Sequence, residues 1–355
     1  MGTVTTLQIA ANDQVINKIP AHGRSITGLA ISDRFLVTAG GDGWIRVWNP
    51  QLREDGSNVA ASTEPPLRNI AIAFSPDDRI VCTGCFDGLI QTWDGQNWTE
   101  IGKDQVHSAS VKAIGFVEDR IISVADDGFL RLRSSTHPYK LVKSVRAHQR
   151  PVHCFDYSPD ERVLATGSFD GTFNIWSYPE LKKLQSVDAH NHWVVGIQFL
   201  PKSSEIATCS WDSTIRFWDR DGNEHLRSRI EAEESVTCFD FCSDGERLAY
   251  GTRSGKVVFV NGRVNKETRE LQCHHDYIAS LEFSRNDRTL LTTSDDGKAC
   301  LWDCITGELL LQLDHPEKVT SASFSHSEDV IVTTCDDGLV RHWHGPKIDG
   351  LPASK

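Results

Sequence analysis

Histidine and aspartate recur in this sequence at spacings that could support acid–base chemistry. In five sets, a histidine precedes a threonine, an aspartate follows four residues after the threonine, and a tryptophan six residues after that. A histidine that is hydrogen-bonded to a carboxylate can act as a general base. The sets are His22, Thr38, Asp42 and Trp48; His148, Thr166, Asp170 and Trp176; His190, Thr208, Asp212 and Trp218; His274, Thr292, Asp296 and Trp302; and His315, Thr333, Asp337 and Trp343. Five copies at constant spacing indicate a repeated structural unit rather than five active sites.

Other motifs for metal binding or catalysis are weak. Cys82 and Cys85 form a CxxC pair, but a zinc site needs four ligands and no second pair is in register. Asp-Asp pairs occur at 77–78, 126–127, 295–296 and 336–337, without the ligands at fixed offsets that calcium loops require. No GxSxG, HExxH, Walker or dinucleotide-binding motif is present. We therefore expect no metal, no cofactor and no enzymatic activity, and we interpret the ten cysteines as buried reduced thiols.

Composition and charge narrow the class of protein. The chain has 355 residues, of which 39% are apolar and 24% charged, as in an ordinary globular protein. Its formal net charge of −12 argues against direct binding of nucleic acid. The N-terminus lacks a signal-peptide pattern, and no stretch approaches the about 20 apolar residues of a membrane span. We expect a soluble intracellular protein without membrane insertion, cytoplasmic or, as an open alternative, nuclear.

A two-residue turn sequence recurs eight times along the chain. It is Asp-Gly in most copies and stands at Asp42, Asp87, Asp127, Asp170, Asp212, Ser254, Asp296 and Asp337. The spacing is about 42 residues, so eight units account for nearly the whole chain. Short apolar or alternating runs flank each turn, and Asp-Gly between two such runs predicts a β-hairpin. Four short strands per unit and no helical period predict an all-β radial repeat.

With these residues in place, the sequence resembles the WD40-repeat family over about residues 7–344. The resemblance implies a β-propeller in which Trp, Ser/Thr, His and Asp form a hydrogen-bonded structural chain. Three units depart from the pattern, since unit two lacks the histidine, unit three has Arg133 in place of Trp, and unit six has Tyr250, Ser254 and Val260. We expect eight four-stranded blades, with seven as the alternative if unit six does not form a blade.

The chain ends predict how the ring closes. Little sequence follows Trp343, whereas the segment around Gln14–Pro20 has the pattern of an outer strand. We expect this segment to pair into the last blade and remove an exposed edge. The expected organisation is an N-terminal extension at 1–12, one propeller at 13–345 and a C-terminal tail at 346–355, with a long polar loop at 53–66 as a further contact or modification site.

The resemblance implies that the face carrying the turn aspartates is the commoner binding face. Residues before the turn Asp and beside the first inner-strand residue reach this face by strand alternation. Tryptophan, tyrosine and arginine are typical of binding hot spots. The candidate partner-binding residues are Trp211, Trp193, Phe169, Arg253, His153, Tyr277 and Phe86. The alternative is that these aromatic residues only pack against one another.

These observations predict a non-catalytic scaffold that binds a protein or peptide. Asp126, Asp295 and Asp336 on the same face suggest a basic partner. We expect a monomer within a complex. Two alternatives stay open: a sensor or regulatory subunit of a larger effector or signalling complex, and, at lower weight, an enzyme that uses the central channel.

Overall fold

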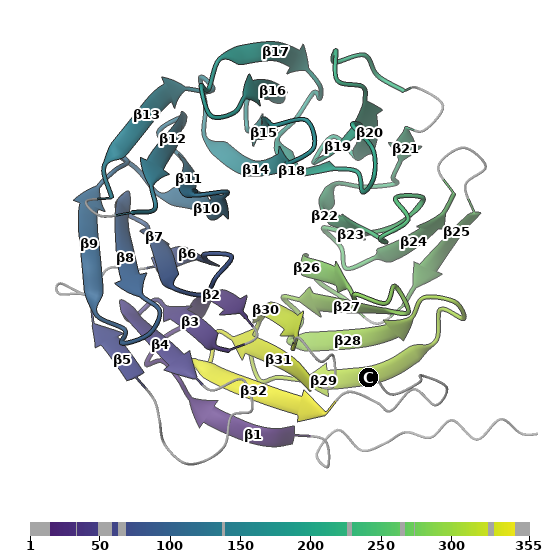
Figure 1. The fold of residues 1–355 in the computed structure, drawn as a ribbon. Helices are drawn as coiled ribbons and strands as arrows, with labels where there is room; N and C mark the ends of the chain where they lie inside the picture. Colours follow the sequence, from purple (N-terminus) through teal and green to yellow (C-terminus); the bar gives the residue numbers. More distant parts are fainter. Residues whose placement is uncertain are drawn as a thin grey trace, which may run out of the picture.

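The computed structural model describes residues 15–32, 34–48, 59–62, 69–136, 139–225, 229–262, 267–272, 274–325 and 330–344. In these ranges it contains strands and turns and no helix, and hence no helix that could cross a membrane. The strands form eight four-stranded antiparallel sheets, arranged as blades around a central axis (Figure 1). The prediction of an eight-bladed all-β propeller is confirmed. The extension at 1–12, the tail at 346–355 and most of the loop at 53–66 lie outside the described residues.

The first four blades run from the innermost to the outermost strand in chain order. Blade 1 contains β2 (Ile26–Ile31), β3 (Leu36–Gly40), β4 (Trp44–Trp48) and β5 (Val59–Ser62). Blade 2 contains β6 (Asn69–Phe74), β7 (Ile80–Cys85), β8 (Leu89–Asp94) and β9 (Glu100–Gln105). Blade 3 contains β10 (Val111–Val117), β11 (Arg120–Ala125), β12 (Phe129–Ser134) and β13 (Leu141–Arg146). Blade 4 contains β14 (Val152–Ser158), β15 (Val163–Ser168), β16 (Thr172–Ser177) and β17 (Lys183–Asp188).

The last four blades follow the same order, except that the final one takes its outer strand from the start of the chain. Blade 5 contains β18 (Val194–Phe199), β19 (Ile206–Ser210), β20 (Thr214–Trp218) and β21 (Ile230–Glu231). Blade 6 contains β22 (Val236–Phe241), β23 (Arg247–Thr252), β24 (Val257–Asn261) and β25 (Glu267–Leu271). Blade 7 contains β26 (Ile278–Phe283), β27 (Thr289–Ser294), β28 (Lys298–Asp303) and β29 (Leu309–Asp314). Blade 8 contains β30 (Val319–Phe324), β31 (Val330–Cys335), β32 (Leu339–His344) and β1 (Val15–Pro20).

The two-residue turns shape the hairpins and also join successive blades. Gly171 has φ of +84°, which glycine adopts without strain, and a Cβ there would meet the His190 carbonyl oxygen at 2.4 Å. The Gly171 carbonyl in turn accepts hydrogen bonds from the backbone N–H groups of Ala189 and His190, at 3.2 and 2.9 Å. The turn of blade 4 is therefore tied to the segment that leads into blade 5. In blade 5 the turn position is Ser213, with φ of +68°.

The core lies between blades rather than inside any one of them. Trp218 of blade 5 is only 4% exposed and packs against Val163, Ala165 and Phe173 of blade 4. Blade 6 forms despite its altered sequence, because Val260 packs into the cluster it shares with blade 5. Sheet-on-sheet burial of this kind supplies the main stabilisation of the ring.

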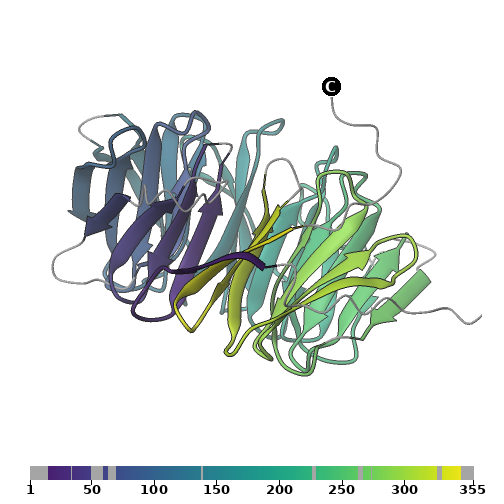
Figure 2. The same cartoon turned by 90° about the horizontal axis from the view of Figure 1, so that it is seen from below.

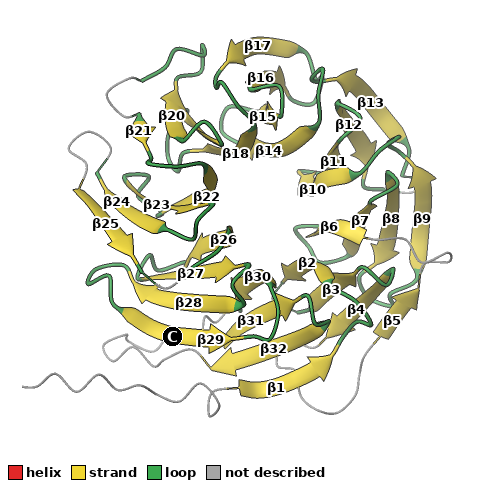
Figure 3. Ribbon diagram, turned by 180° about the vertical axis from the view of Figure 1, so that it is seen from behind, coloured by secondary structure: helices red, strands yellow, loops and turns green. Residues whose placement is uncertain are grey.

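The ring closes through β1. This strand pairs antiparallel with β32, with Ile19 opposite Val340, so blade 8 combines the two ends of the described chain. Figures 2 and 3 show β1 alongside β32, outside the rest of blade 8. Each innermost strand contacts the innermost strands of both neighbours, including β30 with β2. Closure leaves no unpaired propeller end among the described strands.

Candidate functional site

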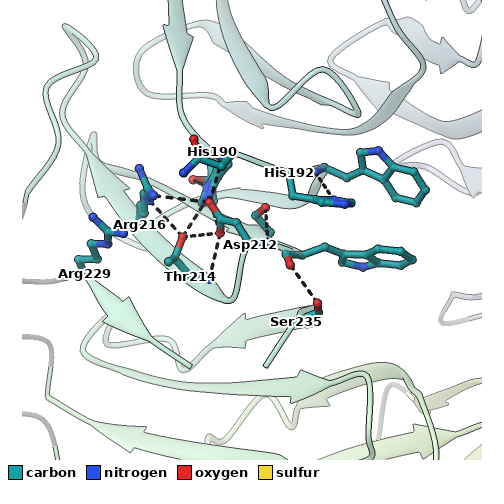
Figure 4. Close-up of polar contacts among 12 residues, drawn as sticks. His190, His192, Asp212, Thr214, Arg216, Arg229 and Ser235 are labelled. Carbon is teal, nitrogen blue, oxygen red and sulfur yellow. Dashed lines mark hydrogen bonds and ion pairs between the residues drawn. The ribbon is translucent and has the colours of Figure 1, made fainter. Parts of the chain in front are cut away.

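The histidine–aspartate sets form buried hydrogen-bonded chains. In blade 5, His190 lies within hydrogen-bonding distance of Asp212 through Nδ1, at 3.0 Å, and of the Thr208 hydroxyl through Nε2, at 2.8 Å. The Trp218 indole donates to the same hydroxyl at 2.8 Å. Figure 4 shows Asp212 lying between His190, Thr214 and Arg216. The same links are made by His22, Thr38, Asp42 and Trp48; by His148, Thr166, Asp170 and Trp176; and by His274, Thr292, Asp296 and Trp302.

The electrostatics of these chains suit a structural role. Burial lowers the pKa of His190, and its contact with Asp212 only partly offsets this effect. Burial of Asp212 acts to raise its pKa, but the hydrogen bonds from His190 and Thr214 outweigh burial and hold it well below its usual range. The His190 side chain is fully buried. Because its partners are internal and it has no access to solvent, it is not placed to move a proton on a substrate.

Blade 8 differs from the expected chain at one link. Trp343 donates to Thr333, and Thr333 contacts Nε2 of His315, as in the other blades. Nδ1 of His315 instead lies 3.1 Å from the backbone carbonyl oxygen of Leu313. Asp337 is held by the guanidinium of Arg341, which lies four residues further along the chain. In blade 8 the turn aspartate is thus held by Arg341, while the histidine contacts a neutral backbone acceptor.

An arginine four residues after the turn aspartate is a support that sequence reasoning missed. Arg46, Arg131 and Arg216 contact the turn carboxylates of blades 1, 3 and 5 as Arg341 does in blade 8. The constant offset in the sequence could have identified it.

Blade 3 contains a nearly complete chain that sequence reasoning also missed. His107 lies 3.0 Å from Asp127 and 2.8 Å from the Ser123 hydroxyl. Arg133 replaces the tryptophan and is 1% exposed, with an ion pair to Asp104. Its Nε and Nη1 atoms are buried, and no described residue forms a hydrogen bond with them. The spacing of His107, Ser123 and Asp127 was the available signal.

Blades 2 and 6 differ more strongly from the Trp–Thr–His–Asp chain of hydrogen bonds. In blade 2, which lacks the histidine, the buried Trp93 indole N–H has no hydrogen-bond acceptor among the described residues. In blade 6, the carboxylate of Glu234 accepts hydrogen bonds from the side chains of Thr252 and Ser254. In blade 6 an acidic residue that precedes β22 thus holds the turn, whereas in other blades a histidine before the innermost strand contacts the turn aspartate.

Five of the predicted partner-binding residues form one continuous stack across blades 4, 5 and 6. His153 lies 5.0 Å from Phe169 between ring centroids, and Phe169 lies 4.3 Å from Trp193 with an interplanar angle of 14°. Trp193 lies 4.6 Å from Trp211, and the Arg253 guanidinium lies 5.3 Å from the Trp211 ring. We call His153, Phe169, Trp193, Trp211 and Arg253 the aromatic stack. Turns and strand starts position these residues, which explains their spacing from blade to blade.

The aromatic stack is partly buried by its own members. His153, Phe169, Trp193 and Trp211 are half-buried, whereas Arg253 is exposed. Burial and the charge of Lys112 together lower the pKa of His153 to about 4, so the imidazole is neutral at physiological pH. The aromatic residues therefore do pack against one another, but the half-buried rings and the exposed Arg253 still reach the surface.

Three further aromatic residues lie near or away from the stack. His192, which sequence reasoning missed, stacks on Trp211 at 5.8 Å, and its place beside Trp193 was the available signal. Tyr277 is half-buried and makes no ring contact with the stack among the described residues. Phe86 in blade 2 is 58% exposed and stands apart from it in the described part of the chain.

The aspartates on this face are largely engaged. Asp126 pairs with Lys112 at 3.1 Å, and Asp295 pairs with Lys318 of the next blade. Asp336 accepts a hydrogen bond from Ser25. Two of the three carboxylates that suggested a basic partner are therefore neutralised within the protein.

The central channel contains carboxylates that bridge blades. Asp156 on β14 accepts a hydrogen bond from the Phe199 backbone N–H of blade 5 at 2.7 Å, and Asp240 on β22 accepts one from Phe283 of blade 7 at 2.9 Å. A hollow of about 420 Å³ lies beside both aspartates, next to Gly196. Burial raises the pKa of both carboxyls. These contacts explain the aspartates as links between innermost strands.

The cysteines agree with the expectation of reduced thiols except at one position. Eight cysteines are free, including Cys82 and Cys85, whose pKa values burial raises to about 12. Cys300 is disulfide-bonded, which corrects the interpretation of all ten as thiols, and Cys273 lies outside the described residues. Among the described residues, no group of three or more His, Cys, Asp or Glu could hold a metal ion.

Comparisons with known proteins agree with the architecture. Residues 118–349 match the family described as IFT122 first beta-propeller, and residues 13–49 and 67–94 match WD domain, G-beta repeat. Periodic tryptophan protein 2 of Saccharomyces cerevisiae is 24% identical over 81% of this chain and 25% of its own length. Protein groucho of Drosophila melanogaster is 23% identical over 82% of this chain and 35% of its own length.

Two further comparisons give the extent of the similarity in sequence and in structure. The U3 small nucleolar RNA-associated protein 21 homolog of Schizosaccharomyces pombe is 30% identical over 45% of this chain and 18% of its own length. The crystal structure of the computationally designed Ika8 protein superposes with a TM-score of 0.81 at 24% identity, covering 94% of this chain and all of that one, which shows the fold alone. The chain thus spans well under half the length of these curated relatives.

Proposed function

Because the chain belongs to the IFT122 first beta-propeller family and carries WD40 repeats, we propose that it is a non-catalytic scaffold that binds a protein or peptide on the face of the aromatic stack. The observation that supports this proposal most directly is that the stack runs without a break across three blades, from His153 to Arg253. Relatives that contain WD repeats support a role in protein interaction. The fold alone would not identify a function, because propellers serve many functions.

The physical case rests on rigidity and residue type. Stacked rings have already lost most of their side-chain freedom, so a partner that lies across their edges costs little further ordering. Tryptophan and arginine contribute more binding energy per residue than most side chains. Tyr277 and Phe86 belong to the proposed surface as outlying contacts, with Phe86 the weaker because it is separate from the stack.

The test is an affinity pull-down with quantitative mass spectrometry. The variant Trp193→Ala/Trp211→Ala removes the centre of the stack, and Ile305→Ala is the control, because Ile305 is an exposed apolar residue of blade 7 outside the stack. Far-UV circular dichroism and solubility establish first that each variant is folded. We expect partners of the wild type to be retained by Ile305→Ala and lost from the double variant. Partners retained by both variants would place binding elsewhere and contradict the proposal.

A second candidate function is a regulatory or sensor subunit of a larger effector complex. It is supported by the similarity to WD-repeat relatives, one of which is named for its association with U3 small nucleolar RNA. That function predicts a stoichiometric partner that remains bound through size-exclusion chromatography of the endogenous protein. We further propose a monomer within such a complex, in the cytoplasm or the nucleus, with one propeller over residues 13–345 and no direct contact to nucleic acid. An enzyme that uses the channel is less well supported, because the carboxylates of Asp156 and Asp240 are already bound by backbone N–H groups.

A further inference from the structure

Arg253 is a charged residue of the binding face with no counter-ion among the described residues. It stands at the position before the turn residue, as do Asp126, Asp295 and Asp336 in other blades. Asp126 and Asp295 form ion pairs, and Asp336 accepts a hydrogen bond. In the described part of the chain, only the cation–π contact with Trp211 engages the Arg253 guanidinium. The charge of this side chain is therefore available to a ligand.

We infer that the Arg253 end of the aromatic stack binds a side-chain carboxylate of the partner, an aspartate or a glutamate. This inference rests on the proposed function and specifies the chemistry of the partner at one position. The N–H groups of a guanidinium lie in its own plane, so a contact of its face with an aromatic ring leaves them free for an acceptor. A carboxylate accepts two of these N–H groups in parallel, which makes the contact both strong and directional.

The surroundings of Arg253 leave this contact open. Glu234, which is tied to the same turn, already accepts hydrogen bonds from Thr252 and Ser254. Asp295 on the adjacent blade is held by Lys318. Burial raises the pKa of Tyr277 to about 12, with the charge of Arg253 acting to lower it, so the tyrosine keeps its hydroxyl proton at physiological pH.

The charge of the whole protein favours a carboxylate over a phosphate. A net charge of −12 repels a dianion more strongly than a monoanion, and Arg253 has no second unpaired cation beside it to compensate, since Lys256 on the same turn is paired with Glu233. The carboxylate is specified at this position alone, and the basic partner expected from the sequence stays a prediction, although two of the three aspartates that suggested it form ion pairs within the protein.

The test begins with selection of displayed random peptides on the full chain. Bound pools are sequenced for the wild type, Arg253→Gln, the control Lys256→Gln and Trp193→Ala/Trp211→Ala. We expect the wild-type and Lys256→Gln pools to share an acidic residue at a fixed position, and the Arg253→Gln pool to lack it. Arg253 is exposed and its side chain has no hydrogen bond among the described residues, so the Arg253→Gln variant is expected to fold normally.

A selected peptide is then synthesised and its affinity measured by fluorescence polarisation. Replacing its acidic residue with the neutral amide should weaken binding to the wild type about tenfold or more, and should have little effect on binding to Arg253→Gln. An unchanged effect in Arg253→Gln, or stack-dependent peptides without an acidic residue, would overturn the carboxylate inference and leave the proposed function standing. Tighter binding of a phosphoserine version would overturn it in favour of a phosphate. Pools that do not depend on Trp193 and Trp211 would overturn the proposed function and this inference together.

Discussion

Trp211 and Trp218 of blade 5 should respond very differently to the same substitution. In Trp218→Phe, the indole hydrogen bond to Thr208 is lost, a contribution of about 1 kcal/mol, because Thr208 keeps its contact with His190. The smaller ring also leaves a void in a site that is 4% exposed, which costs about 1–2 kcal/mol. In Trp211→Phe, a half-buried ring whose indole N–H has no acceptor is shortened, so we expect a loss within about 0.5 kcal/mol.

The assay is urea unfolding followed by far-UV circular dichroism, which does not depend on tryptophan emission. We expect Trp218→Phe to lower the free energy of unfolding by about 2–3 kcal/mol relative to the wild type. A double-mutant cycle with Thr208→Val isolates the hydrogen bond, with an expected coupling of about 1 kcal/mol between Trp218 and Thr208. Equal losses for the two tryptophan variants, or a coupling near zero, would refute the structural role assigned to the Trp–Thr–His–Asp chain.

Three further predictions concern departures from the repeat. Arg133→Trp should raise the melting temperature, because it removes two buried N–H groups without partners and offers an indole N–H to Ser123; an unchanged or lower value would contradict this. Burial and the charge of Arg341 lower the pKa of His315 to about 4, below its unfolded value of about 6.5, so its contribution to stability is lost as pH falls through this interval. The loss is about 2 kcal/mol between pH 7.5 and 5, and His315→Gln should show a flatter dependence of unfolding free energy on pH. Ser213→Gly should stabilise and Gly171→Ser destabilise, each by about 1 kcal/mol in urea unfolding, because both positions have positive φ; opposite signs would count against the turn geometry.

The number of blades and their hairpins could be predicted because their causes are local. An Asp-Gly pair between two apolar runs sets the turn, and its recurrence sets the count. Blade 6 was predicted despite its lost polar residues, since Gly255 and the apolar strand after it retain the pattern. The missed chain of His107 and Ser123 shows that a single absent tryptophan hid a pattern that was otherwise present.

Contacts between blades could not be predicted in the same way. The sequence indicates that Asp295 and Lys318 reach one face, but their pairing depends on how adjacent blades are offset. The contact of His315 with the Leu313 carbonyl rather than with Asp337 follows from no difference in the motif residues, since blade 5 has an arginine at the same offset and keeps its histidine on the aspartate. Positions of the stack residues followed from strand alternation, whereas the ring-to-ring distances required the structure.

The pairing of β1 with β32 has a consequence for synthesis on the ribosome. The segment that contains β1 emerges before the other described strands, yet its partner emerges only when almost the whole described chain has been made. Until then the β1 segment has no strand to pair with, and β2 lacks its neighbour β30. Nascent chains in this state expose strand edges that favour aggregation. The protein thus becomes a closed ring in a late step, and a chaperone that shields the first-made strand would protect it until then.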